Sequence, residues 1–284
     1  MKYNIVIPAH NEEKFLALTL DSVLCQTLIP NKVIIVNDNS DDGTEAIIDL
    51  YVSKNPQLLE KRNIRSSSLH LPGSKVVNAF NMGLERVDKE FDFIVKLDAD
   101  IILPPQYFQI IADIFKNDHK VGIAGGFAYE QDASGQWKRN HPMNNDHVRG
   151  AFKSYTKACF YAMGGLRNAM GWDTVDELLA KFHGFAICTE ESLMPKHLRP
   201  IGKAYNKKAK LMQGRAMYTM RYGLPITILA SAKMAWKQKK IQSFLDNLNG
   251  FLQAGREKVP FIVTHEEGEF IRKLRWKNIK GKLF

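Results

Sequence analysis

Short apolar runs alternate with amphipathic blocks along the first part of the chain, and this pattern predicts strands and helices in turn. Residues 2–8 and 32–37 are apolar runs of strand length. Residues 12–26 and 44–51 carry apolar side chains at helical spacing, and Asn11 is expected to cap the first of these helices. Strand, helix, strand and helix in this order form a βαβ unit, which predicts a parallel sheet.

The alternation continues through most of the first two hundred residues. We expect further strands at 64–69, 91–97, 121–129 and 185–189, and helices at 76–87, 104–115 and 178–183. Such alternation predicts an α/β fold with a doubly wound, mostly parallel sheet flanked by helices. Beyond Pro200 the apolar spacing is helical, and lysine and arginine are frequent. We therefore expect an α/β domain at 1–200 and a basic, mostly helical C-terminal extension at 201–284.

Two carboxylates end the apolar run that starts at Phe91. Only one small residue separates Asp98 from Asp100, so in an extended strand both side chains point the same way. Open α/β sheets bind their ligands at the carboxyl ends of strands. Two converging carboxylates repel unless a proton or cation lies between them, and Mg²⁺ or Mn²⁺ takes such oxygen ligands and bridges to phosphates. The pattern predicts a metal–diphosphate site, although a lone Asp-x-Asp is more often a solvated turn.

The charge of the chain is unevenly distributed. Of the net charge of +10, residues 1–195 carry −5 and residues 196–284 carry +15. This asymmetry implies an anionic partner for the C-terminal third, such as nucleic acid, acidic lipid or a phosphorylated substrate. The three cysteines are odd in number and far apart, which favours a reducing, cytoplasmic location. No apolar run reaches the roughly 18 residues of a transmembrane helix, and no signal peptide is expected.

Several polar or aromatic residues allow two interpretations. His197 and Arg199 could reach a diphosphate, but a surface basic cluster is the favoured interpretation. Trp172 either stacks on a sugar ring or packs in the core. Glu12 either contacts a ligand or only places a carboxylate in the first turn of a helix.

Three stretches carry a family resemblance through their order and spacing: Ile5–Glu13, Val36–Thr44 and Leu97–Asp100. Together they resemble the family 2 glycosyltransferases, which have the nucleotide-diphospho-sugar transferase (GT-A) fold. A less specific similarity continues through residues 149–150, 164–166 and 171–177. The family usually has an acidic pair where this chain has Asn37 and Asp38, so only Asp38 is left for nucleobase recognition.

The resemblance implies metal-dependent, inverting transfer of a sugar from a nucleotide-diphospho-sugar, by default a UDP-sugar, to a hydroxyl of a glycan or lipid-linked acceptor. The implied cofactor is Mg²⁺ or Mn²⁺, which neutralises charge on the leaving diphosphate. The residues implied at the donor site are Pro8, Ala9 and Glu12 in the nucleotide pocket, Asp38 at the base, Asp98 at the ribose or metal, and Asp100 at the metal.

Inverting transfer also needs a carboxylate that takes the proton of the attacking hydroxyl. Asp98 and Asp100 are poor candidates because metal-bound carboxylates are weak proton acceptors. The next acidic group in a suitable loop contains Asp173, Asp176 and Glu177. We expect Asp176 to be the base, since it falls where the resemblance places an acidic motif, with Glu177 in reserve and Asp173 as a helix cap.

Two other functions fit parts of the sequence. A nucleotidyltransferase shares the doubly wound sheet but uses a glycine-rich phosphate loop after its first strand, where this chain has Ala9-His10-Asn11-Glu12. A non-catalytic nucleic-acid-binding protein would suit the basic C-terminal third. No zinc-finger or RNA-recognition signature accompanies that charge, and the acidic N-terminal part would oppose wrapping, so we expect no nucleic acid partner.

The basic C-terminal third also suggests a membrane partner. Lysine and arginine are interleaved with apolar and aromatic residues at 224–240 and 270–284, as in helices that lie on anionic membranes. We expect these segments to rest peripherally on the inner face of the membrane. The alternative is a C-terminal subdomain that packs its apolar side on the core.

Overall fold

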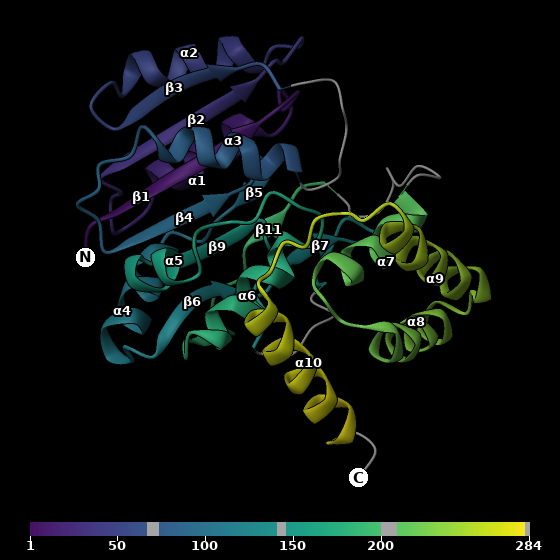
Figure 1. Cartoon of the computed structure of the whole chain (residues 1–284). Coiled ribbons are helices and arrows are strands. Elements are labelled where there is room, and N and C mark those ends of the chain that lie inside the picture. Colours follow the sequence, from purple (N-terminus) through teal and green to yellow (C-terminus); the bar gives the residue numbers. More distant parts are fainter. Residues whose placement is uncertain (67–73, 141–145, 200–208, 282–284) are drawn as a thin grey trace.

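The computed structural model of the chain describes residues 1–66, 74–140, 146–199 and 209–281 (Figure 1). A seven-stranded sheet lies at the centre, in the spatial order β10-β6-β9-β4-β1-β2-β3. Its strands are β1 (Tyr3–Ala9), β2 (Lys32–Asp38), β3 (Leu59–Ile64), β4 (Phe93–Leu97), β6 (Val121–Gly126), β9 (Phe152–Thr156) and β10 (Ala186–Glu190). The predicted α/β fold with a mostly parallel sheet and a helical C-terminal region is confirmed.

The apolar runs form strands that are covered on both faces. Every residue of β4 is buried, as are the four consecutive apolar residues 33–36 of β2. Continuous apolar runs of this kind are typical of parallel strands with helices on either side. Strands β1, β2, β3 and β4 are parallel, whereas β9 runs antiparallel to both of its neighbours, β4 and β6.

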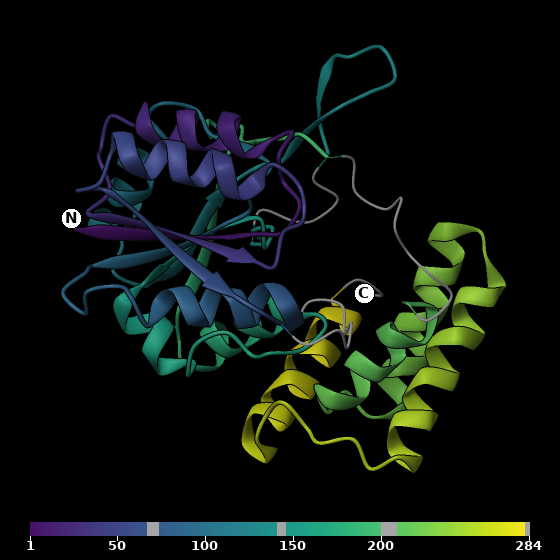
Figure 2. The same cartoon turned by 90° about the horizontal axis from the view of Figure 1, so that it is seen from above.

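Helices cover the two faces of the sheet. Figure 2 looks along the sheet from above and shows α1 and α2 on one face and α3 on the other. These helices are α1 (Leu16–Leu24), α2 (Thr44–Lys54), α3 (Ser74–Leu84), α4 (Tyr107–Asn117), α5 (Lys157–Ala162) and α6 (Trp172–Phe182). Helices on the two faces of a parallel sheet leave the ends of its strands uncovered. Sheets of this kind bind ligands at the carboxyl ends of their strands.

A second, four-stranded sheet stands beside that edge in the order β5-β11-β7-β8. Its strands are β5 (Ile101–Ile102), β7 (Tyr129–Gln131), β8 (Trp137–Arg139) and β11 (Lys196–His197). With two or three residues each, these strands are too short to give an apolar pattern in the sequence. The small sheet brings residues near position 100 against residues near position 197.

The C-terminal region is helical, as expected. It contains α7 (Ala209–Thr219), α8 (Leu224–Gln238), α9 (Ile241–Arg256) and α10 (His265–Lys280). Helices α7 and α9 touch through glycines: a Cβ on Gly214 would lie 1.8 Å from the Asn247 carbonyl oxygen, and one on Gly250 would lie 2.0 Å from that of Leu211. The predicted domain boundary at residue 200 lies outside the described residues.

Helix α10 joins the C-terminal helices to the sheet domain. The Phe270 ring packs edge-on against Phe182 of α6 at 5.5 Å, and Ile271 is fully buried in the common core. Figure 2 shows yellow α10 between the sheet and α7–α9. Among the described helices, none combines the length and apolarity that crossing a membrane requires.

Three local predictions were wrong. The third strand is Leu59–Ile64, so it precedes most of the predicted 64–69, of which 67–69 lie outside the described residues. Helix α6 begins at Trp172, not at residue 178. Asn11 is not a helix cap, because α1 begins at Leu16 and Asn11 has a left-handed φ of 56°.

Candidate active site

The predicted donor-site residues gather at the carboxyl edge of the central sheet. Pro8 and Ala9 end β1, and Asp38 is the last residue of the neighbouring β2. Asp98 follows β4 on the other side of β1. Because parallel strands present their carboxyl ends at one edge, the motifs near residues 10, 38 and 98 become neighbours.

The loops after β1 and β2 are tied together by their own polar side chains. The amide of Asn11 donates to Asp41 Oδ1 at 2.6 Å, and Asn11 Oδ1 accepts from the Asp41 backbone at 3.0 Å. The Glu12 backbone donates to Thr44 Oγ1 at 2.7 Å. The left-handed Asn11 therefore fixes the turn that presents Glu12.

Asp38 is buried and faces the segment after β3. Its two carboxylate oxygens accept from the Ser66 backbone at 2.9 Å and from Ser66 Oγ at 2.6 Å. Its carbonyl oxygen lies 2.7 Å from His10 Nδ1. Each carboxylate oxygen keeps a second lone pair, so Asp38 can still accept a hydrogen bond from a ligand.

Asp100 and His197 meet through the small sheet. His197 of β11 pairs with Ile101 of β5, the residue directly after Asp100. This register places His197 Nε2 3.3 Å from Asp100 Oδ2; the side chain of His197 is 10% exposed and that of Asp100 is 9% exposed. Burial lowers the pKa of His197, but the hydrogen bond and charge of Asp100 outweigh burial and raise it above its ordinary value. The favoured interpretation of His197 as part of a surface basic cluster was wrong; the small sheet that buries it has no strong sequence signal.

Arg199 bridges the two acidic motifs. Its guanidinium pairs with Glu12, and its Nε lies 3.8 Å from Asp100 Oδ2. Burial, countered in part by Arg199 and reinforced by Asp100 and Asp98, raises the pKa of the Glu12 carboxyl to about 7. Arg199 is half exposed, which leaves its guanidinium accessible from the open edge of the sheet.

Asp98 differs from Asp100 in its partner. The ammonium of Lys96, which is only 2% exposed, forms an ion pair with Asp98 Oδ1. The same ammonium lies 5.1 Å from the centre of the Trp172 ring. Trp172 is itself buried, so of its two interpretations the structure favours core packing over stacking on a sugar.

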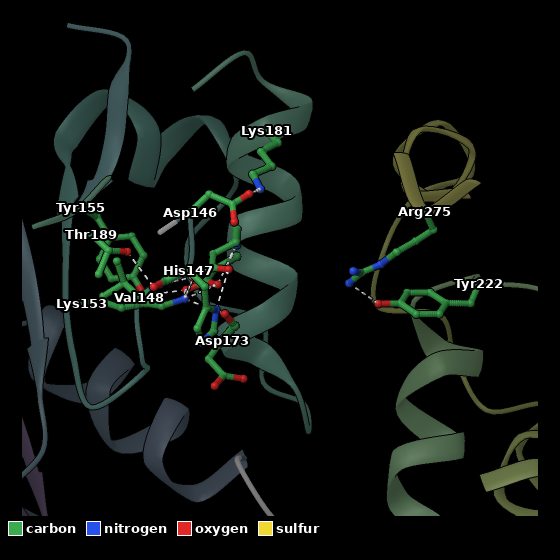
Figure 3. Close-up of polar contacts among 12 residues, drawn as sticks. Asp146, His147, Val148, Lys153, Tyr155, Asp173, Lys181, Thr189, Tyr222 and Arg275 are labelled. Atoms are coloured by element: carbon green, nitrogen blue, oxygen red, sulfur yellow. Dashed lines mark hydrogen bonds and ion pairs between the residues drawn. The ribbon is translucent and has the colours of Figure 1, made fainter. Parts of the chain in front are cut away.

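The three acidic residues of α6 occupy different environments (Figure 3). Asp176 is buried, accepts from Lys153 Nζ at 2.8 Å and 3.0 Å, and accepts from the Tyr155 hydroxyl at 2.6 Å. Glu177 is buried as well and lies 2.9 Å from the same ammonium. Asp173 is only partly buried, and its carboxylate makes no hydrogen bond or ion pair to any residue described; it extends away from the cluster in Figure 3.

The two buried carboxylates beside Lys153 have pKa values shifted in opposite directions. Burial raises the pKa of Asp176 to about 6, because desolvation outweighs the attraction of Lys153. Glu177 also accepts from the Val148 backbone at 2.9 Å and lies 3.0 Å from His147 Nδ1. Although burial opposes it, these partners and Lys153 lower the pKa of Glu177.

A divalent cation fits the donor set at this edge only in part. Across the described ranges, no group of three or more His, Cys, Asp or Glu side chains is arranged to hold a metal ion. Asp100 and His197 supply two converging donors; the other ring nitrogen of His197, Nδ1, lies 4.0 Å from Glu130 Oε1 and makes no hydrogen bond to a described residue. Mg²⁺ and Mn²⁺ sites with one or two protein ligands are completed by substrate phosphates, so the pair suits such a cation.

Residues 4–170 match the family model described as glycosyl transferase family 2. The chain belongs to this family. The match covers the stretches at β1, β2 and β4 that carried the predicted resemblance, and it supports a glycosyltransferase over the nucleotidyltransferase and nucleic-acid-binding alternatives.

Curated relatives are similar over about half of this chain. The minor teichoic acid biosynthesis protein GgaA of Bacillus subtilis is 27% identical over 151 residues, which are 52% of this chain and 32% of that protein. The chondroitin synthase of Escherichia coli is 28% identical over 128 residues, 44% of this chain and 17% of that protein. The matched part is thus about a third or less of the relatives' own length.

Solved structures share the fold across almost the whole chain. S. aureus TarS 1-349 in complex with UDP-GlcNAc superposes with a TM-score of 0.64 at 17% identity, and the match covers 99% of this chain and 92% of that TarS 1-349 chain. The mannosyltransferase PcManGT of Pyrobaculum calidifontis, solved with GDP-Man and Mn²⁺, has a TM-score of 0.58 at 14% identity and covers 90% of this chain and 75% of that one. At these identities the likeness establishes the GT-A type of fold.

Proposed function

We propose that the chain transfers a sugar from a UDP-sugar to a hydroxyl of a glycan or lipid-linked acceptor, with inversion and with a divalent cation. The observation that carries this proposal is the convergence of Asp100, His197 and Arg199 beside Glu12 at the carboxyl edge of the sheet. Carboxylate, imidazole and guanidinium groups together suit a diphosphate and its counter-ion.

Asp100 and His197 hold the cation in this proposal, and Arg199 contacts the diphosphate. A bound Mg²⁺ or Mn²⁺ neutralises the charge that develops on the leaving nucleoside diphosphate. Asp98, paired with Lys96, is left to face the ribose. The cation is also supported by PcManGT, which has a similar fold and was solved with Mn²⁺.

The nucleoside lies over the ends of β1 and β2. Pro8, Ala9 and Glu12 line the pocket, and Asp38 accepts a hydrogen bond from the base. UDP is the proposed nucleotide because TarS 1-349 was solved with UDP-GlcNAc. Asp38 lies at the end of β2, and its carboxylate oxygens can each accept one more hydrogen bond. Both features support its role as acceptor for the base.

We assign the general base to Asp173 instead of Asp176. A base must reach the incoming hydroxyl, and Asp176 is 1% exposed with both oxygens bonded to Lys153 or Tyr155. Glu177 is held by Lys153, His147 and the Val148 backbone. Asp173, in the first turn of α6, is a partly exposed residue whose carboxylate has no hydrogen-bond or ion-pair partner among the described residues. Asp173 takes the hydroxyl proton as the acceptor oxygen attacks the anomeric carbon.

A donor panel tests the proposed function. UDP release would be measured for a set of UDP-sugars with Mn²⁺, Mg²⁺ or EDTA, with water and then a mixture of short glycans as acceptors. The expected result is cation-dependent release from one UDP-sugar that rises when glycans are added. Full release in excess EDTA, or release from no nucleotide sugar, would contradict the proposal.

We also propose that α8 attaches the enzyme peripherally to the anionic inner face of the membrane, near a lipid-linked acceptor. Its outward side carries exposed apolar residues at helical spacing, ending in Trp236, which is 82% exposed. Exposed lysines follow at 237, 239 and 240. An apolar stripe with a terminal tryptophan and lysines is the pattern of interfacial helices.

In helix α10, the other predicted membrane segment, two of the basic side chains form hydrogen bonds to other parts of the protein. Arg272 donates to the Arg221 carbonyl at 2.9 Å, and Arg275 donates to the Tyr222 hydroxyl at 2.6 Å. Together with the buried Ile271, these contacts favour docking of α10 on the protein. Residues 282–284 of this segment lie outside the described residues. The membrane proposal therefore rests on α8.

A further inference from the structure

Two buried lysines face each other across the centre of the sheet. Lys96 of β4 and Lys153 of β9 are directly paired in the antiparallel register, and their side chains are 2% and 0% exposed. Like charges opposite each other destabilise a strand pair, and a buried ammonium is costly unless it is paired. The groups that neutralise these two buried ammonium charges therefore indicate the role of the lysine pair.

Lys153 directs every proton of its ammonium to the start of α6. It donates to the backbone carbonyl of Asp173 at 2.6 Å and to Asp176 Oδ1 at 2.8 Å, and lies 2.9 Å from Glu177 Oε1. An ammonium has three donors, so the group is fully satisfied by one helical segment. The bond to the Asp173 carbonyl fixes the backbone of the proposed base itself.

Lys96 connects the same segment to the donor site. Its ammonium pairs with Asp98 and lies over the ring of Trp172, the residue before Asp173. A cation over an indole face is attractive, most of all when both are buried. Lys96 and Lys153 thus hold two consecutive residues of α6, and Lys96 links them to the end of β4.

The loop before β9 is shaped for this contact. A Cβ on Gly150 would lie 2.7 Å from Trp172 Cζ2 and 3.1 Å from Asp173 Cβ, so only glycine lets the first turn of α6 approach so closely. The next residue, Ala151, accepts from the Asp98 backbone at 2.7 Å. The donor-site strand, the glycine loop and the first turn of α6 therefore form one packed unit.

We propose that Lys153, with Lys96 opposite it, is a positioning residue that fixes the first turn of α6 and so directs the Asp173 carboxylate toward the acceptor hydroxyl. This inference rests on the proposed role of Asp173. A buried ion pair is seldom needed for stability, since apolar replacements often serve as well. The bond from Lys153 to a backbone carbonyl gives the pair a geometric role that apolar side chains lack.

The test uses a charge-balanced variant, because Lys153→Met alone would leave both Asp176 and Glu177 buried without the cation that they share. Lys153→Met/Asp176→Asn removes one charge of each sign and retains the Tyr155 partner. Lys61→Met/Glu45→Gln is the matched control, since it removes an ion pair of 3.0 Å between β3 and α2. Each protein is assayed for UDP release from the UDP-sugar that the donor panel selects, and for UDP affinity by calorimetry with Mn²⁺.

We expect Lys153→Met/Asp176→Asn to fold, to bind UDP within about twofold of the parent, and to lose at least tenfold in kcat, while the control keeps its kcat. In protein that already carries Asp173→Asn, the same two substitutions should not lower kcat further, because the base that Lys153 positions is already absent. An unchanged kcat, or a loss that multiplies with that of Asp173→Asn, would overturn the inference.

A second readout follows the geometry without activity. In protein labelled with 5-fluorotryptophan, the ¹⁹F resonance of Trp172, assigned by Trp172→Phe, should shift in the Lys153 variant while the other tryptophans stay in place. If the double variant does not fold, Lys153→Arg is measured instead, and a parental kcat with an unmoved Trp172 resonance overturns the inference. Full activity of Asp173→Asn would instead refute the proposed base and leave the contacts of Lys153 to α6 as they are.

Discussion

His197 Nε2 lies 3.3 Å from Asp100 Oδ2, although a large part of the chain separates the two residues in sequence. The contact exists because β11 pairs with β5 directly after Asp100. A two-residue strand thus completes the site that the Asp98–Asp100 motif begins.

Removing either member of the pair should weaken cation binding. We expect Asp100→Asn and His197→Gln each to lower the affinity for Mn²⁺, measured by electron paramagnetic resonance with saturating UDP, by more than about tenfold, since even an outer partner of a metal ligand is worth 10–100-fold. His183→Gln is the control, because His183 is an exposed histidine at the end of α6. Parental Mn²⁺ affinity in both site variants would refute the assignment.

Neutralising the proposed base should stop chemistry and spare binding. Asp173→Asn is expected to lower kcat for transfer by about 10²–10⁴, the usual contribution of a general base, with UDP affinity nearly unchanged. Asp176→Asn should mainly lower the free energy of unfolding, because it removes a partner of buried Lys153. If Asp176→Asn loses transfer per folded molecule and Asp173→Asn does not, the two roles are reversed.

The raised pKa of Glu12 predicts how stability depends on pH. Burial raises this pKa from 4.5 to about 7, so between these values the folded protein binds more protons than the unfolded chain. Stability from this carboxyl is full below pH 4.5 and is lost as pH rises through 7, by at most about 3 kcal/mol. Glu12→Gln should flatten the fall in unfolding free energy between pH 5 and pH 8, measured in urea.

The control for this pH effect is Glu85→Gln, at an exposed carboxylate just after α3. That variant should keep the parental dependence on pH. A Glu12→Gln protein whose unfolding free energy falls as steeply as that of the parent would show that Glu12 does not titrate in this range.

Membrane attachment should depend on α8 more than on α10. Flotation with vesicles of phosphatidylcholine and phosphatidylglycerol is expected to recover the protein at low salt and less of it at high salt, because the attraction to anionic lipid is screened. Trp236→Ala should reduce recovery severalfold, whereas Trp276→Ala on α10 should change it little. Absence of binding at low salt would favour an apolar surface that contacts protein.

Local patterns in the amino-acid sequence were enough to predict the fold class and to predict that the candidate donor-site residues share one edge of the sheet. Continuous apolar runs such as residues 33–36 can only be buried between layers, so they specify parallel strands flanked by helices. Asp38, Asp98 and Asp100 stand at the ends of such runs. Because parallel strands present their carboxyl ends at one edge of the sheet, the three residues are predicted to lie at that edge. These features depend on local patterns that are complete within a few residues of the chain.

Which residues join the candidate site became apparent only from contacts between segments that are distant in the sequence. The two-residue strands β5 and β11 carry no periodic signal, yet their pairing buries His197 against Asp100 and sets Arg199 beside Glu12. Asp176 is buried because it pairs with Lys153 of β9, whereas Asp173 is partly exposed. The sequence of α6 contains no sign of this partner on a distant strand. Contacts between distant segments form only when the strands pair, because register is set by the packing of the whole sheet.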